Sequence, residues 1–169
     1  MLDYLQKNNM LENTIIVYSS DQGFFLGEHG LFDKRWMYEE SFRMPFLISW
    51  KGKIKPGSRY KQMIQNIDYA PTFIAAGGQK VPAQMQGKSL LPTLANNAPK
   101  WRKSVYYHYY ERRTEHNAPR HEGVRTDHYK LMHFYDHKDY DLFDLEKDPN
   151  EMKDVSKDPV YADILKKMK

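Results

Sequence analysis

The 169-residue sequence contains no cysteine, so it forms neither a disulfide nor a thiolate metal site. It has no run of about 20 apolar residues, the length that a membrane-spanning helix needs. Its N-terminus also lacks the basic and apolar segments that together make a signal peptide. Within this sequence, these absences leave no disulfide and no membrane-spanning helix, and they leave the cellular compartment open.

Positive charge is in small excess. Lys and Arg number 26 against 22 Asp and Glu, which gives a formal net charge of +4. The basic residues are scattered among acids and form no tract, so nucleic acid is not indicated as a partner. A mean hydropathy of −0.83 and a 14% aromatic content, mostly Tyr, predict a thin core with much amphipathic surface. A portion of a larger α/β fold would have this composition.

The most informative stretch is 14–23. Its β-branched residues predict a strand, which ends in hydroxyls followed by Asp21, Gln22 and Gly23. In open α/β sheets, ligands collect where the strands end. Carboxylate and amide oxygens suit Ca²⁺ or Mg²⁺, whereas zinc would favour His or Cys. Taken alone, however, these three residues are more typical of an ordinary turn or a helix N-cap.

A glycine-punctuated loop follows, with Gly-Glu-His-Gly at 27–30 and Lys34 beyond it. At these residues, together with Asp21 and Gln22, the chain resembles the type I, formylglycine-dependent sulfatases of the alkaline-phosphatase-like superfamily. The resemblance implies that Asp21 and Gln22 bind calcium, with magnesium the weaker candidate. It also implies that Lys34, twelve positions after Gln22, contacts the sulfate as a catalytic residue. His29 alone is more typical of a structural histidine, and we assign it no catalytic role.

The nucleophile of the sulfatases that this chain resembles is absent. It derives from a Cys or Ser in a Cys/Ser-x-Pro-x-Arg motif, and the sequence has neither a cysteine nor a Ser-x-Pro-x-Arg. An Asp-Asp pair for the other half of the metal site is also missing near the N-terminus. In the family, these elements precede the Asp-Gln pair. We therefore expect a C-terminal part of a longer enzyme that needs the missing N-terminal portion and is inactive alone. The resemblance implies a periplasmic, extracellular or lysosomal location.

The first part of the chain alternates predicted helices and strands, as expected for an α/β fold. We interpret 1–98 as the C-terminal part of a sulfatase α/β catalytic core. Asp68 is the expected N-cap of a helix that ends at two glycines. The predicted elements are a helix within 2–11, strands at 14–19, 44–50 and 60–65, a helical turn at 36–42 and a helix at 70–76.

The composition changes near Pro99, after which aromatic and polar residues alternate. This alternation predicts antiparallel strands joined by turns. A terminal amphipathic helix at 160–168 is expected to turn Ile164 and Leu165 inward. We interpret 99–169 as a small α+β subdomain with an antiparallel sheet. The predicted strands are 105–110, 123–126, 129–135 and 140–145.

This C-terminal segment extends the resemblance over nearly the whole chain. Around 115–123 it is most similar to the N-acetylglucosamine-6-sulfatases, which implies a sulfated glycosaminoglycan sugar as the substrate. His116, His121 and Arg125 are then candidates to bind the sugar, because imidazole and guanidinium groups donate hydrogen bonds to its oxygens. Equally, Arg125 could pair with an acid in the sheet while the histidines decorate a loop. The Tyr run at 106–110 is more typical of packing.

Two other functions fit the same residues. A phosphonate or phosphate monoester hydrolase of the same superfamily shares the fold and much of the metal chemistry. A non-catalytic module that binds sulfated glycan would need no nucleophile. The three hypotheses differ in the segment that would precede this chain.

Overall fold

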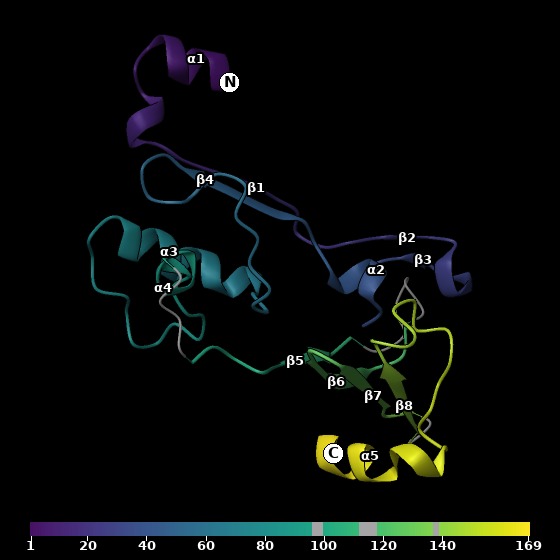
Figure 1. The fold of residues 1–169 in the computed structure, drawn as a ribbon. Helices are drawn as coiled ribbons and strands as arrows, with labels where there is room; N and C mark the ends of the chain where they lie inside the picture. The colour runs from purple at the N-terminus through teal and green to yellow at the C-terminus, as the bar shows by residue number, and fades with distance from the viewer. Residues whose placement is uncertain (96–99, 112–117, 137–138) are drawn as a thin grey trace. The chain divides into compact units, whose positions relative to one another are not determined.

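A computed structural model of the protein describes residues 1–95, 100–111, 118–136 and 139–169 (Figure 1). The chain forms two compact units. The first contains residues 1–21 and 45–102, and the second contains residues 22–44 and 103–169. Each unit is therefore discontinuous in sequence, and the loop after the first strand belongs with the C-terminal sheet.

The first unit contains one antiparallel strand pair and several short helices. Strand β1 pairs with β4 so that Ile15 lies opposite Trp50 and Ser19 opposite Phe46. The expected helix at 70–76 is confirmed, but the expected strand at 60–65 is wrong, because this stretch forms no ladder and runs as a loop. The elements of the first unit are α1 (Leu2–Lys7), η1 (Leu11–Asn13), β1 (Ile15–Ser19), β4 (Phe46–Trp50), η3 (Asn66–Asp68), α3 (Tyr69–Ala76) and α4 (Leu91–Leu94).

Asp68 is the main polar anchor of this unit. It stands at the N-cap position of α3, as expected, but its side chain makes no capping bond to that helix. Instead its buried carboxylate accepts hydrogen bonds from the backbone N–H groups of Gln65 and Lys88, both at 2.8 Å, and from Arg102. Burial opposes ionisation, but the Arg102 guanidinium and the two N–H donors outweigh it and lower the pKa of Asp68. The side chain therefore joins three separate parts of the chain.

We expect Asp68→Asn to destabilise the protein by about 3 kcal/mol at pH 7, since it leaves the Arg102 charge unpaired. Because the folded pKa of Asp68 lies below its unfolded value, the wild-type advantage is present above about pH 4 and is lost as the pH falls through the folded pKa. Urea denaturation of both proteins between pH 7 and pH 3 measures the difference. Asp127→Asn, at an exposed position, is the matched control. A difference that stayed constant with pH would contradict this account.

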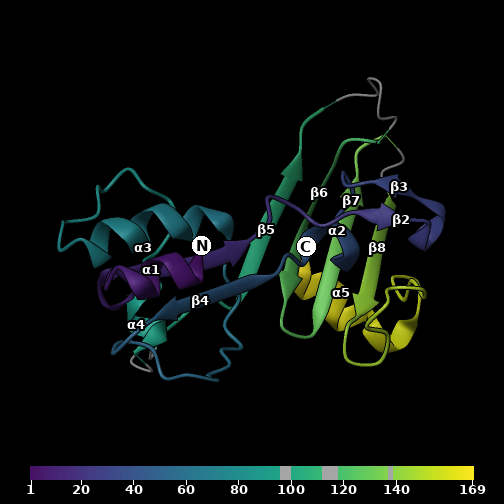
Figure 2. The same cartoon turned by 90° about the horizontal axis from the view of Figure 1, so that it is seen from above.

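The second unit is built on a four-stranded antiparallel sheet in the order β5-β6-β7-β8, with its strands side by side in Figure 2. This confirms the antiparallel sheet expected in the C-terminal region. Tyr107 and Met132 flank Gly123 on the neighbouring strands. The strands are β5 (Ser104–Tyr109), β6 (His121–Thr126), β7 (Tyr129–Phe134) and β8 (Asp139–Asp144).

One face of the sheet packs against the segment 22–44. Met37 lies at the centre of this core with Met132, Phe134 and Phe143. A Cβ atom on Gly123 would lie 2.5 Å from the Met37 sulfur and 2.3 Å from the Leu131 carbonyl oxygen, so this contact requires glycine. The segment contains β2 (Phe25–Leu26), η2 (Glu28–Gly30), β3 (Phe32–Asp33) and α2 (Glu39–Phe42).

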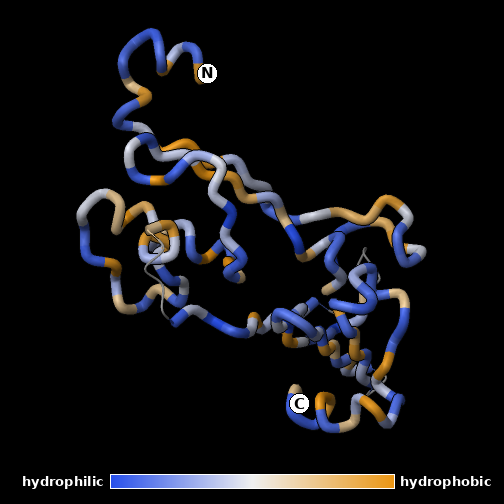
Figure 3. The backbone as a smooth tube through the Cα atoms, viewed as in Figure 1, coloured by the Kyte–Doolittle hydropathy of each residue, from blue (hydrophilic) through white to orange (hydrophobic). Residues whose placement is uncertain are grey.

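The C-terminal helix contributes a second cluster. Leu131 and Leu142 pack with Tyr161, and Ile164 and Leu165 lie against them, as the helical spacing predicted. Figure 3 shows hydrophobic and hydrophilic segments alternating along this helix. This C-terminal region consists of η4 (Pro159–Tyr161) followed by the helix α5 (Ala162–Met168). Within the described ranges, no helix is long and apolar enough to cross a membrane.

Candidate functional site

Strand β1 leads directly into the predicted metal ligands. The Ser19 hydroxyl at its end donates to the Pro45 carbonyl oxygen at 3.0 Å, and the Tyr69 hydroxyl lies 3.0 Å away. Because the Ser19 proton is used on Pro45, Tyr69 acts as the donor toward Ser19. Asp21 is the last residue of the first unit at this point, and Gln22 begins the second.

Gln22 is connected to Lys34 through a buried hydroxyl. The Ser41 hydroxyl, on α2, donates to the Lys34 carbonyl oxygen at 2.6 Å, and the Gln22 amide nitrogen lies 2.8 Å from the same hydroxyl. Gln22 also lies 3.4 Å from the Lys34 carbonyl oxygen. The structure therefore brings the side chain of Gln22, predicted for the metal, to the backbone of Lys34, predicted for the sulfate.

The turn after Gln22 depends on glycine. The Gly23 N–H donates to the Ser41 carbonyl oxygen at 2.8 Å. A Cβ atom at this position would lie 1.9 Å from the Glu40 carbonyl oxygen, closer than any side chain tolerates. Gly23 therefore allows the backbone after β1 to lie directly against α2.

Lys34 follows a short hairpin formed by β2 and β3. The hairpin is closed by the Gly27 N–H, which donates to the Leu31 carbonyl oxygen at 3.0 Å. Between them, the His29 ring stacks on Tyr38 with centroids 4.0 Å apart, and its Nε2 lies 3.3 Å from the Glu40 carboxylate. These contacts are those of a packed structural histidine.

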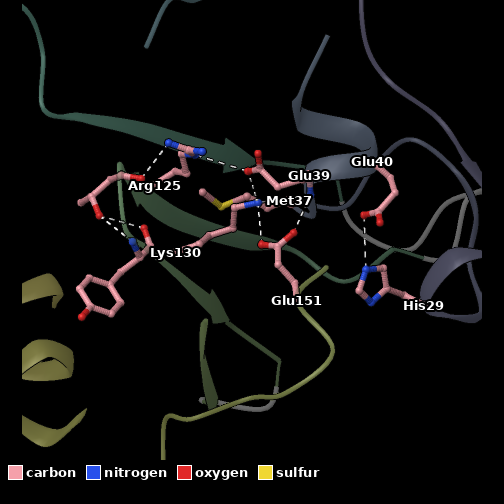
Figure 4. A network of polar contacts seen from close by, with 9 residues as sticks. His29, Met37, Glu39, Glu40, Arg125, Lys130 and Glu151 are labelled. Atoms are coloured by element: carbon pink, nitrogen blue, oxygen red, sulfur yellow. Dashed lines mark hydrogen bonds and ion pairs between the residues drawn. The ribbon is translucent and has the colours of Figure 1, made fainter. Parts of the chain in front are cut away.

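A buried ionic cluster fixes this segment to the sheet (Figure 4). The fully buried ammonium of Lys130 lies 2.7 Å from the Met37 carbonyl oxygen, 2.8 Å from Glu39 and 2.7 Å from Glu151. Glu151 also accepts a hydrogen bond from the Glu39 N–H at 2.7 Å. Arg125 joins the cluster through Glu39 at 3.4 Å. Two cations thus balance two carboxylates.

The two carboxylates of this cluster shift in opposite directions. Burial raises the pKa of Glu151 despite the neighbouring ammonium of Lys130. Burial alone would also raise the pKa of Glu39, but Lys130 and Arg125 together outweigh it and hold the pKa below its ordinary value. Glu39 is therefore the carboxylate that carries the charge most firmly, because two cations face it.

The predicted sugar-binding residues differ in their surroundings. Arg125 contacts Glu39 of α2 and donates to the Thr126 carbonyl oxygen at 2.8 Å. His121 is fully buried, and its Nδ1 lies 2.8 Å from the Pro119 carbonyl oxygen, so Nδ1 carries the proton. Burial lowers the pKa of His121, which favours the neutral ring. His116 lies outside the described residues.

The donors at the predicted metal site are few but chemically suited to calcium. Asp21 supplies a carboxylate and Gln22 an amide, both hard oxygen donors. Calcium takes six to eight oxygens, so two residues make only part of a site. Among the residues that the structure describes, no group of three or more His, Asp or Glu side chains is placed to hold a metal ion.

A small aromatic pocket of about 270 Å³ was not expected from the sequence. It is lined by His108, Tyr110, Arg120 and Tyr135. The rings of His108 and Tyr110 stack with centroids 3.8 Å apart, and the Tyr135 hydroxyl lies 3.4 Å from the His108 Nε2. Of the Tyr run, Tyr107 packs against the core as expected, whereas Tyr110 is exposed.

Comparison with known proteins shows close likeness to sulfatases. The chain is 50% identical to an N-acetylglucosamine-6-O-sulfatase of Bacteroides thetaiotaomicron, over 96% of this chain and 30% of that protein. It matches the solved structure of a protein in complex with its substrate D-glucosamine-2-N,6-O-disulfate with a TM-score of 0.94, at 48% identity, over 99% of this chain and 35% of that one. The structure of a phosphonate monoester hydrolase from Silicibacter pomeroyi matches with a TM-score of 0.84, at 26% identity, over 98% of this chain and 35% of that one.

The fold is thus that of the sulfatases in the alkaline-phosphatase-like superfamily, with mixed helices and strands. Within this class, the chain belongs to the family described as N-sulphoglucosamine sulphohydrolase, C-terminal, which matches residues 27–169. The resemblance inferred from the sequence motifs is confirmed. The chain spans about a third of the length of the relatives that it matches.

Several residues that shape the site carried no motif. Ser41 gave no signal, because a lone serine in a short helix is common. Lys130 gave only a weak signal, a charged residue between Tyr129 and Leu131 in a predicted strand. Glu151 gave none, since it lies between the last predicted strand and the terminal helix, and its positive φ of 52° is unusual for a residue other than glycine.

Replacing Lys130 by Met should destabilise the protein by about 3 to 5 kcal/mol, because Glu39 and Glu151 lose their buried partner. Urea denaturation measures the loss. Lys51→Met is the matched control, as it removes an exposed pair with Glu12 that contributes about 0 to 1 kcal/mol. Adding Glu151→Gln to Lys130→Met should recover part of the loss. Equal small effects at Lys130 and Lys51 would show that the cluster contributes little.

Proposed function

We propose that this chain is the C-terminal part of a sulfatase that hydrolyses sulfate esters on sulfated glycosaminoglycan sugars such as 6-sulfated N-acetylglucosamine. The observation that carries the proposal is the hydrogen-bonded loop in which Ser41 joins Gln22 to Lys34. Its support is the family membership and the 50% identity to an N-acetylglucosamine-6-O-sulfatase. The whole enzyme would include a preceding portion with the formylglycine nucleophile, and residues 1–169 alone would be inactive.

Within this proposal, Asp21 and Gln22 supply part of a calcium site. A bound calcium ion would polarise a sulfuryl oxygen. Lys34 is the proposed catalytic residue, because an ammonium beside the sulfate offsets the negative charge that builds up on the transferring group. Neither the carboxylate, the amide nor the ammonium serves as the nucleophile.

For the sugar we propose Arg125 together with His116 and His121. Guanidinium and imidazole donors suit the hydroxyl, carboxylate and sulfate oxygens of a glycosaminoglycan. Arg125 forms an ion pair with Glu39 in the ionic cluster, and this contact holds its guanidinium in place. His121 is fully buried, so its proposed contribution is to hold the Pro119 backbone just before β6.

The proposed organisation follows the change in composition. Residues 1–98 would form the C-terminal part of the catalytic core, and residues 99–169 an α+β subdomain with its antiparallel sheet and terminal helix, against which residues 22–44 of the first part pack. The location proposed from the family resemblance is periplasmic, extracellular or lysosomal.

A phosphonate monoester hydrolase is the second candidate, because one such enzyme shares the fold at a TM-score of 0.84. The two functions are separated by kcat/KM of the full-length enzyme on an aryl sulfate and on an aryl phosphonate. A sulfatase should prefer the sulfate monoester. A preference for the phosphonate would replace the proposed function by the alternative.

In the full-length enzyme, Asp21→Ala should abolish turnover and calcium retention together, since a charged ligand is lost. Metal content after gel filtration, measured by inductively coupled plasma mass spectrometry, checks this. Asp127→Asn is the control at an exposed position. Wild-type calcium content in Asp21→Ala would remove Asp21 from the metal site.

Lys34→Ala in the full-length enzyme should lower kcat/KM roughly 10²-fold or more on every sulfate ester, the scale of losing one charge-stabilising group.

Alanine at Arg125, His116 or His121 should act selectively. These variants should lose kcat/KM on 6-sulfated N-acetylglucosamine but keep most activity on a small aryl sulfate, which lacks the sugar contacts. Equal losses on both substrates would assign the residue to stability or chemistry.

A further inference from the structure

The hydrogen bonds of Ser41 determine which way the Gln22 amide faces. The Lys34 carbonyl oxygen only accepts hydrogen bonds, so Ser41 must donate its single hydroxyl proton to it, over 2.6 Å. Toward Gln22, 2.8 Å away, Ser41 then acts as an acceptor. The partner must be the NH₂ group of Gln22, because its oxygen cannot donate. The amide oxygen therefore points to the other side.

This orientation is held firmly. Ser41 is fully buried, so water does not compete for its hydroxyl. Its carbonyl oxygen accepts from the Gly23 N–H at 2.8 Å, and its own N–H donates to the Tyr38 carbonyl oxygen at 3.1 Å. With the hydroxyl engaged on both sides, Ser41 holds its proton toward Lys34 and a lone pair toward Gln22.

We propose that Ser41 is a positioning residue that presents the Gln22 amide oxygen, and not its nitrogen, to calcium. The inference rests on the calcium site of the proposed function and adds a residue to it. Without the Ser41 acceptor, the Gln22 amide nitrogen keeps only its longer contact, 3.4 Å, with the Lys34 carbonyl oxygen, so its NH₂ group can turn toward the cation. An amide nitrogen does not bind a hard cation, so affinity falls. Partners that orient a ligand in this way typically contribute 10- to 100-fold to metal affinity.

The test is calcium titration of the chelator-treated full-length enzyme by isothermal titration calorimetry. Ser41→Ala should weaken the calcium Kd about 10-fold or more. The same change in a Gln22→Ala background should have no further effect, since the oriented amide is already gone. On a small aryl sulfate at saturating calcium, kcat should recover toward the wild-type value, because excess metal refills the site.

The matched control is Thr72→Val. Thr72 is a buried hydroxyl of the other unit that donates to the Asp68 carbonyl oxygen at 2.5 Å and accepts from the Leu90 N–H at 2.9 Å. Its loss should lower the thermal stability with the calcium Kd unchanged. Ser41→Cys is the second variant if Ser41→Ala fails to fold, because it fills the site with a weak acceptor and should also weaken the Kd.

The outcomes separate the two proposals. If Gln22→Ala weakens calcium binding while Ser41→Ala and Ser41→Cys bind calcium as the wild type does, the positioning role is overturned and the metal site stands. Additive losses from Ser41→Ala and Gln22→Ala would also overturn it. If the wild-type enzyme binds no calcium, the metal site of the proposed function falls, and the positioning role falls with it.

Discussion

The buried ammonium of Lys130 is the constraint on which the second unit depends. A buried ammonium without water needs acceptors and opposite charge, and here it donates to the Met37 carbonyl oxygen and forms ion pairs with Glu39 and Glu151. Two of these come from the segment 22–44 and one from beyond the sheet. Satisfying one charge therefore fixes the site-bearing segment against β7. Removing any partner would leave a buried charge exposed to the apolar core of Met132, Phe134 and Phe143.

The Lys130 cluster also positions the residues of the proposed site. Glu39 begins α2, so its position sets that of Ser41 two residues later, which in turn holds Gln22 and the Lys34 backbone. Gly23 completes the arrangement because only a residue without a Cβ atom fits beside the Glu40 carbonyl oxygen. The residues proposed for chemistry are thus oriented by neighbours that need not touch a substrate. Mutations in the sheet can therefore affect the loop through this hydrogen-bonded path as well as through the Met37 core.

Local pattern in the sequence predicted most of the fold. Alternating residues identified the C-terminal strands, helical spacing placed Ile164 and Leu165 inward, and the motif around Asp21, Gln22 and Lys34 indicated the site. The residues 60–65 were predicted wrongly, since a short apolar stretch does not form a strand without a partner ladder. The Lys130 cluster could not be predicted, because its acceptors lie 93 positions away at Met37 and after a turn at Glu151. Such contacts leave no local signal.

The discontinuous second unit also has a consequence for synthesis on the ribosome. Met37 and Lys130 are 93 residues apart, and the Glu39 N–H bonds to a side chain 112 residues away. At about 5 to 20 residues per second, the site loop emerges roughly 5 to 20 seconds before the strand that holds it. During that interval its apolar residues, Phe25 and Met37 above all, have no core to enter. Nascent chains paused between these two points would be the form most exposed to aggregation and to chaperone capture.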